Sequence, residues 1–167
     1  MKDFKLETLR KHMSYNKETG EFTWIGNQFG ITKGIVAGHL SKDGYIKIQI
    51  DKRIYLAHRL VWLWNTGSMP KSEIDHIDGN KSNNAFSNLR ETTRSQNCKN
   101  TKIRSTNSSG CIGVHKVKRS GKYQARISGF NKERIVLGTF DTYEEAVAVR
   151  KNAEDKYGYH TNHGRLT

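Results

Sequence analysis

The chain has 167 residues, a formal net charge of +13 at pH 7 and a hydrophobic share of only 34%. Such a length allows one ordinary domain or two small ones, each with a modest core. The sequence has no run of about 18 apolar residues, which argues against a transmembrane helix. Its charged N-terminus also lacks the apolar segment of a secretory signal. We therefore expect a protein of the cytoplasm, with no membrane contact.

The first half of the sequence predicts a mixed α+β domain. Leu6, Leu9 and Met13 recur at helical spacing, and residues 45–50 alternate between apolar and polar side chains as a half-buried strand does. Gly67 suits the end of a helix. The expected elements are a helix over residues 4–13, strands over 21–25, 45–50 and 54–56, and a helix over 57–65.

The second half predicts a hairpin and then a separate small unit. We expect strands over residues 74–77 and 88–91, followed by a helix that begins near Thr93. A polar stretch over 99–109 has the composition of a linker. Beyond it we expect strands over 112–117, 122–127 and 134–140, a turn near 129–131, and a helix opened by Thr142 and Glu145 as a capping box. The predicted domains are residues 1–98, a basic linker over 99–109, and residues 110–167.

The positive charge is concentrated between these two predicted domains and in the second of them. Residues 92–132 contain ten Lys and Arg residues and no Asp or Glu. A stretch of one sign this long repels itself unless a polyanion neutralises it, and a phosphate backbone does so. We therefore expect a nucleic acid partner. An ordinary solvated basic surface is the alternative.

The two cysteines, Cys98 and Cys111, form no CxxC pair. A structural zinc site is therefore not expected, and in a reducing compartment both should be free thiols.

One group of polar residues has the chemistry of phosphodiester hydrolysis. Asp75 and His76 lie on the first strand of the predicted hairpin, Asn88 on the second, and Asn97 one turn into the helix. A neutral imidazole accepts a proton from water at neutral pH. A carboxylate and an amide oxygen suit Mg²⁺, and an amide carbonyl can accept the other imidazole N–H. A hairpin with a helix packed on it could bring all four together.

These residues lie in a longer pattern that resembles the ββα-metal motif of phage HNH homing endonucleases. The pattern consists of IDHIDGNKSNN (residues 74–84), SNLR (87–90) and SQN (95–97). The resemblance implies a ββα-metal core over about 72–104. It implies that His76 is the general base, that Asn88 orients it, and that Asp75 and Asn97 bind the metal. Asn97 stands where many members have His. An amide oxygen there favours Mg²⁺, with Mn²⁺ as a possible substitute.

Residues 107–162 resemble a second family, the Apetala/ERF-type DNA-binding domain. The resemblance is carried by NSSG (107–110), GKYQARI (121–127) and LGTFDTYEEA (137–146). It implies a three-stranded antiparallel sheet that packs on one helix and enters the major groove of DNA, with Arg126 and Arg134 at contact positions. Plant members place Trp on that face, whereas all three Trp here lie before residue 65. We therefore expect a different base preference.

Alternation along the middle strand supports such a use of the sheet. Gln124 and Arg126 share one face with Lys122 and Ser128, and Ala125 lies on the opposite face. A solvated sheet face is the alternative for each residue. The residues expected to contact DNA are Arg94, Lys99, Lys102, Arg104, His115, Lys116, Lys118, Arg119, Lys122, Gln124, Arg126 and Arg134.

The sequence thus predicts a metal-dependent endonuclease that cuts double-stranded DNA and leaves 5′-phosphate and 3′-hydroxyl ends. If a phage encodes it, it should act in the host bacterial cytoplasm. We expect a monomer rather than a dimer, because no dimer interface is evident. Two alternatives remain open: a non-catalytic, sequence-specific DNA-binding regulator derived from such a nuclease, and a basic protein that binds RNA or the ribosome.

Overall fold

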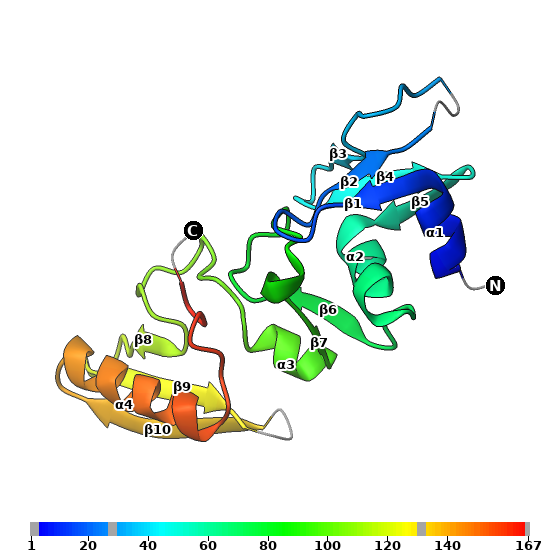
Figure 1. Cartoon of the computed structure of the whole chain (residues 1–167). Helices are drawn as coiled ribbons and strands as arrows, with labels where there is room; N and C mark the ends of the chain where they lie inside the picture. Colours follow the sequence, from blue (N-terminus) through cyan, green and yellow to red (C-terminus); the bar gives the residue numbers. More distant parts are fainter. Residues whose placement is uncertain (1–3, 27–29, 130–132, 166–167) are drawn as a thin grey trace. The chain divides into compact units, whose positions relative to one another are not determined.

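The computed structural model describes residues 4–26, 30–129 and 133–165. The chain divides into two compact units, Met1–Arg94 and Ser95–Thr167 (Figure 1). The division comes slightly before the boundary expected at residue 98. The turn expected near 129–131 lies partly outside the described residues. Each unit is described below by itself.

The first unit follows the predicted order of elements and adds two short strands, β1 and β3. Where described, its sheets are all antiparallel: β1 pairs with β2, β4 lies between β3 and β5, and β6 pairs with β7. The elements are α1 (Leu6–His12), β1 (Met13–Tyr15), β2 (Phe22–Trp24), β3 (His39–Leu40), β4 (Ile46–Ile50), β5 (Arg53–Leu56), α2 (Ala57–Thr66), β6 (Glu73–His76), the 3₁₀ turn η1 (Phe86–Asn88) and β7 (Leu89–Thr92).

A continuous apolar core joins these small sheets to the two helices. The alternation that predicted β4 is confirmed, because Ile48 and Ile50 are fully buried while Gln49 is exposed. α2 buries Leu60, Val61 and Leu63 in the same core, and Gly67 ends the helix in the left-handed conformation. Ile74 of β6 and Leu89 of β7 also belong to this core, so the β6–β7 hairpin is fixed to the rest of the unit.

The second unit contains the predicted three-stranded antiparallel sheet and helix. Its elements are α3 (Arg94–Cys98), which begins one residue before the unit, β8 (Val114–Lys116), β9 (Tyr123–Ser128), β10 (Arg134–Phe140) and α4 (Tyr143–Lys156). β9 lies between β8 and β10, and α4 lies along one face of the sheet (Figure 1). The capping box of Thr142 and Glu145 is present. The core is small, with Val114, Ala125 and Ala146 fully buried.

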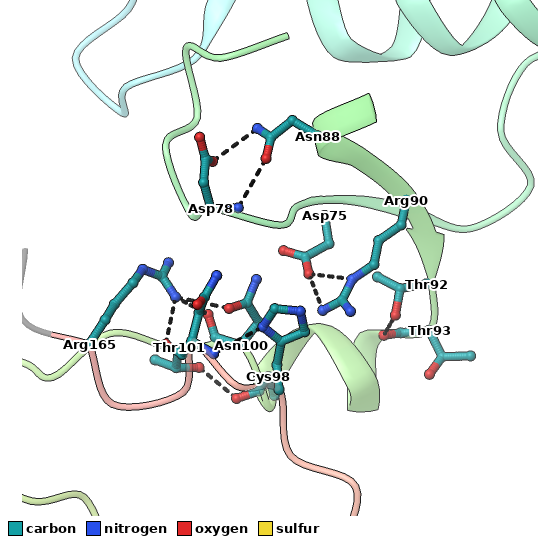
Figure 2. A network of polar contacts seen from close by, with 12 residues as sticks. Asp75, Asp78, Asn88, Arg90, Thr92, Thr93, Cys98, Asn100, Thr101 and Arg165 are labelled. Carbon is teal, nitrogen blue, oxygen red and sulfur yellow. Dashed lines mark hydrogen bonds and ion pairs between the residues drawn. The ribbon is translucent and has the colours of Figure 1, made fainter. Parts of the chain in front are cut away.

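The segment expected to be a linker is partly built into this second unit. The backbone of Thr101 accepts a hydrogen bond from Gly164 N–H at 2.8 Å, and Ile103 N–H donates to the Arg165 carbonyl at 3.0 Å. The Arg165 guanidinium also donates to the Asn100 side chain at 2.9 Å (Figure 2). Residues 99–103 are therefore fixed against the C-terminal segment, because that segment satisfies their polar backbone groups.

No helix within the described residues is long and apolar enough to cross a bilayer. Both cysteines are free thiols, Cys98 exposed and Cys111 buried.

Candidate functional site

The β6–β7 hairpin places the predicted acidic and histidine residues at the edge of the first unit's core. In the register of the hairpin, Asp75 lies opposite Arg90 and His76 lies opposite Leu89. Asp75 is 7% exposed and His76 only 4%. Buried polar groups of this kind are costly unless they are paired, so their partners indicate what the site is built to hold.

Asp75 is paired with Arg90 across the hairpin. The carboxylate oxygen Oδ2 accepts two hydrogen bonds from this guanidinium, from Nη2 at 2.7 Å and from Nε at 3.0 Å (Figure 2). Arg90 therefore compensates the buried charge of Asp75 and fixes the orientation of the carboxylate. The sequence motif contained Arg90 but gave no reason to assign it this role.

His76 is held among three side chains of the first unit. Its Nε2 lies 3.1 Å from Oδ1 of Asn84. The ring of His58 stands perpendicular to it at 5.1 Å between centroids, and the ring of Tyr45 lies 6.0 Å away. Burial lowers the pKa of His76, although the hydrogen bond that its ring donates to Asn84 opposes this shift. His76 is therefore a neutral imidazole at neutral pH, as a proton acceptor must be.

His58 is also buried and neutral. Burial, with smaller contributions from the charges of His76 and Arg59, lowers its pKa to about 3. It packs against Tyr45 as well as His76, with ring centroids 5.3 Å apart. His58 is therefore an uncharged side chain that packs against His76.

Asn88 does not have the contact that the motif suggested. Its Oδ1 accepts a hydrogen bond from Asp78 N–H at 3.0 Å, and its Nδ2 donates to Asp78 Oδ1 at 2.9 Å (Figure 2). Nδ2 also donates to the Asn83 carbonyl at 2.9 Å. The amide side chain that contacts His76 is that of Asn84 instead. Asn88 therefore stabilises this loop, because both the oxygen and the nitrogen of its amide form hydrogen bonds there.

Asn84 and Gly20 both lie in segments whose Asn and Gly residues are typical of turns. Asn84 is in fact 4% exposed. Gly20 has φ +74°, and a Cβ at this position would stand 2.0 Å from the carbonyl carbon of Asn84. The local sequence around Asn84 is typical of a turn. Its burial depends on contact with Gly20, more than sixty residues away, which no local pattern encodes.

The two expected metal ligands belong to different units. Asp75 lies in the first unit and Asn97 in the second. No cluster of three or more His, Cys, Asp or Glu side chains with a metal-binding arrangement occurs among the described residues. The donor chemistry nevertheless fits Mg²⁺, which keeps several waters and needs few protein oxygens: an oriented carboxylate and an amide oxygen.

The predicted DNA-contact residues of the second unit are centred on the sheet face opposite α4. Arg126 Nε donates to Gln124 Oε1 at 2.6 Å, and Gln124 Nε2 donates to Thr139 at 3.4 Å. His115 pairs with Gln124 in the sheet register. Burial lowers the pKa of His115, and the positive charges of Arg126 and Arg134 lower it further. The two arginines therefore lie close enough to His115 to interact with it electrostatically.

Several other predicted contact residues are placed differently. Lys99 donates to the Tyr157 carbonyl at 2.6 Å, and Lys122 forms an ion pair with Asp141 at 2.8 Å. Lys116 lies opposite Tyr123 in the register, on the face that α4 covers, and helps to line an open groove of about 840 Å³ with His115 and Lys118. The exposed members of the set include Arg94, Lys102, Arg104, Lys118, Arg119 and Arg134.

Comparison with known proteins identifies the family. A family model described as HNH endonuclease matches residues 55–99, which include the whole β6–β7 hairpin. DNA endonuclease I-HmuI of Bacillus phage SP01 is 35% identical over 139 residues, which cover 80% of this chain and 74% of that protein. Protein 3.8 of Escherichia phage T7 is 35% identical over 86 residues, or 49% of this chain and 71% of that protein.

No solved structure matches the chain significantly. Members of the matched family generally depend on a divalent metal ion. With a relative at 35% identity that this chain covers by 74%, and with the family model on the buried Asp75 and His76, the chain belongs to the phage-type HNH endonucleases.

Proposed function

We propose that this endonuclease hydrolyses phosphodiester bonds of double-stranded DNA, with His76 as the general base. The observation that supports this most is the environment of His76: a buried imidazole, kept neutral by its surroundings, beside the oriented carboxylate of Asp75. Similarity to a DNA endonuclease and a net charge of +13 favour DNA as the substrate.

In the proposed reaction, His76 takes a proton from a water molecule as its oxygen attacks phosphorus. The bond from phosphorus to the 3′ oxygen breaks, and the leaving oxygen takes a proton from a solvent water molecule, which gives a 5′-phosphate and a 3′-hydroxyl. Asp75 and Asn97 would hold one divalent cation, Mg²⁺ or in its place Mn²⁺, which would supply positive charge to the phosphate and the leaving oxygen. The two hydrogen bonds from Arg90 orient the Asp75 carboxylate for this purpose.

For the second unit we propose DNA binding by an Apetala/ERF-type domain. Arg126, held by Gln124, and the exposed Arg134 lie on the open sheet face and suit contacts to phosphate or base edges. In this proposal the sheet supplies most of the affinity, and the protein acts as a monomer.

A plasmid cleavage assay tests the proposal. We expect nicking or cleavage of supercoiled plasmid with Mg²⁺, none after EDTA, and recovery when Mg²⁺ is restored. End labelling should detect 5′-phosphate and 3′-hydroxyl termini. Metal-independent cleavage, or cleavage of RNA in preference to DNA, would contradict the proposal.

A further inference from the structure

Lys81, an exposed residue of the loop after β6, reaches towards the turn between β3 and β4. Its ammonium group donates a hydrogen bond to the Asp43 carbonyl at 3.0 Å and stands over the ring of Tyr45, 4.6 Å from the ring centre. The centre of the same ring lies 6.0 Å from that of the His76 imidazole. Lys81 and the proposed base are therefore neighbours of one aromatic ring.

The positive charge of Lys81 has no anionic partner within the described residues, where its contacts are to a carbonyl and an aromatic ring. The carboxylate of Asp43 forms an ion pair with Lys47 instead, at 3.3 Å. Burial lowers the pKa of His76, and the charge of Lys81 lowers it further, so this charge acts at the site. An exposed cation in such a position attracts the phosphates of DNA.

The structure holds this lysine in place before any ligand binds. The Asn80 side chain accepts a hydrogen bond from Ser82 N–H at 3.1 Å, and Asn80 N–H donates to Asp78 Oδ1 at 2.8 Å, which fixes the backbone on both sides of Lys81. A Cβ added at Gly44 would lie 3.5 Å from Lys81 Cδ, so the stem also packs against this glycine. A side chain that is already ordered loses less conformational entropy when it binds an anion.

We propose that Lys81 binds a backbone phosphate next to the one that is attacked, and that Tyr45 positions the ammonium group for this contact. An ammonium group has three donors, so it can bind a phosphate oxygen and keep its hydrogen bond to the Asp43 carbonyl. The inference deepens the proposed function and rests on it, because His76 defines where the attacked phosphate lies. It adds a DNA contact from the first unit, beside the base.

The first test measures DNA affinity of the full chain against salt concentration, by fluorescence anisotropy with Ca²⁺ in place of Mg²⁺. Lys81→Met keeps the stem and removes the charge. It should weaken binding about 3- to 10-fold at about 0.1 M salt and reduce the slope of log affinity against log salt by about 1. Lys81→Arg should keep the wild-type slope. The matched control is Lys52→Met, an exposed lysine in the turn at the other end of β4, which should leave the slope unchanged.

A second test locates the phosphate. On a DNA whose cut has been mapped, the phosphates beside the cut are replaced one at a time by uncharged methylphosphonates. One replacement next to the cut should weaken binding by the wild type and have no effect on Lys81→Met, because that variant has already lost the charge pair.

Tyr45 is tested by the same salt dependence. Tyr45→Leu, which removes the ring from beneath the ammonium group, should weaken binding in the same direction as Lys81→Met but by less. Tyr45→Phe, which keeps the ring, should bind as the wild type does.

Two results would overturn the inference. An unchanged salt slope in Lys81→Met would leave Lys81 as a tether between the loop and the turn. Methylphosphonate effects that are equal in the wild type and Lys81→Met at every position would exclude a phosphate partner beside the cut. Failure of the proposed function is a separate outcome, because normal cleavage by His76→Ala would exclude that base without changing the salt slope of Lys81→Met.

Discussion

The two units of this endonuclease use polar residues in opposite ways. The first unit buries the proposed site residues Asp75 and His76 at the edge of a core that contains thirteen buried apolar residues in the described part. The second has a core of only four such residues where described and keeps Arg126 and Arg134 on an open sheet face. Proton transfer gains from desolvation, whereas attraction to a polyanion needs accessible charge.

The small core of the second unit is supplemented by buried charge. Arg150 on α4 is 2% exposed, with Nη1 3.0 Å from Glu154 Oε1 and Nη2 3.4 Å from His163 Nε2. Its guanidinium also lies over the ring of Tyr159, at 4.9 Å. These contacts attach the C-terminal segment to α4, a role that apolar residues fulfil in the first unit.

The largest expected effect separates cutting from binding. Asp75→Ala should reduce the cleavage rate at least about 100-fold, because the cation that stabilises the charged phosphate loses a ligand. DNA affinity, measured by fluorescence anisotropy with Ca²⁺ in place of Mg²⁺, should stay near the wild-type value. Near-normal cleavage by this variant would exclude Asp75 from the metal site.

The buried His58 of the first unit predicts a loss of stability in acid. The unfolded state protonates His58 near pH 6.5, but the folded state does so only near pH 3, so stability is full above pH 6.5 and falls as pH decreases towards 3. At pH 5 this linkage costs about 2 kcal/mol. Between pH 7.5 and 5, the free energy of unfolding of His58→Phe should therefore fall by about 2 kcal/mol less than that of the wild type.

Urea unfolding followed by tryptophan fluorescence makes this measurement specific, because all three tryptophans lie in the first unit. Equal acid sensitivity of the wild type and His58→Phe would show that His58 is not held neutral by burial.

A third substitution tests the close contact between Gly20 and the backbone of Asn84. Gly20→Ala should destabilise the first unit by more than about 1 kcal/mol, because a Cβ meets the Asn84 backbone in addition to the unfavourable positive φ. Gly34→Ala is the matched control: its φ is also positive, at +88°, but no atom lies within 4 Å of the added Cβ. Equal unfolding free energies for the two variants would show that the close approach of Gly20 to Asn84 does not contribute to stability.

A further prediction concerns the cations on the open sheet face of the second unit. Arg126→Ala should weaken DNA binding by about 1–3 kcal/mol if the guanidinium reads a base. If it contacts a phosphate, the slope of log affinity against log salt should instead fall by about 1. Arg53→Ala, an exposed arginine of the first unit, is the control. Equal effects of both substitutions would argue against a specialised sheet face.

The elements with strong periodicity were predictable from the sequence, and their tertiary partners were not. Alternation identified β4 and β9, and the capping box of Thr142 and Glu145 marked the start of α4 correctly. The strands β1 and β3 were missed because strands of three and two residues carry little periodic signal.

The sequence motif predicted the site residues, and the structure differs from that prediction in one contact. Asp75 and His76 lie together on β6, as expected, whereas the amide side chain that contacts His76 is that of Asn84 in place of Asn88. Asn84 is buried through Gly20, and the partnership of Asp75 with Arg90 follows from strand register. Both depend on distant pairings that local patterns do not contain. The linker was misjudged because its partner is the C-terminal segment.

The central claim, that the β6–β7 hairpin carries the general base and the sheet of the second unit binds DNA, is tested most directly by measuring cleavage and affinity on one DNA with two variants. His76→Ala should bind as the wild type does and leave the DNA uncut. The double variant Arg126→Ala with Arg134→Ala should bind more weakly yet cut at the wild-type rate once DNA is saturating. Cleavage by His76→Ala, or a double variant that stays inactive on saturating DNA, would contradict the account.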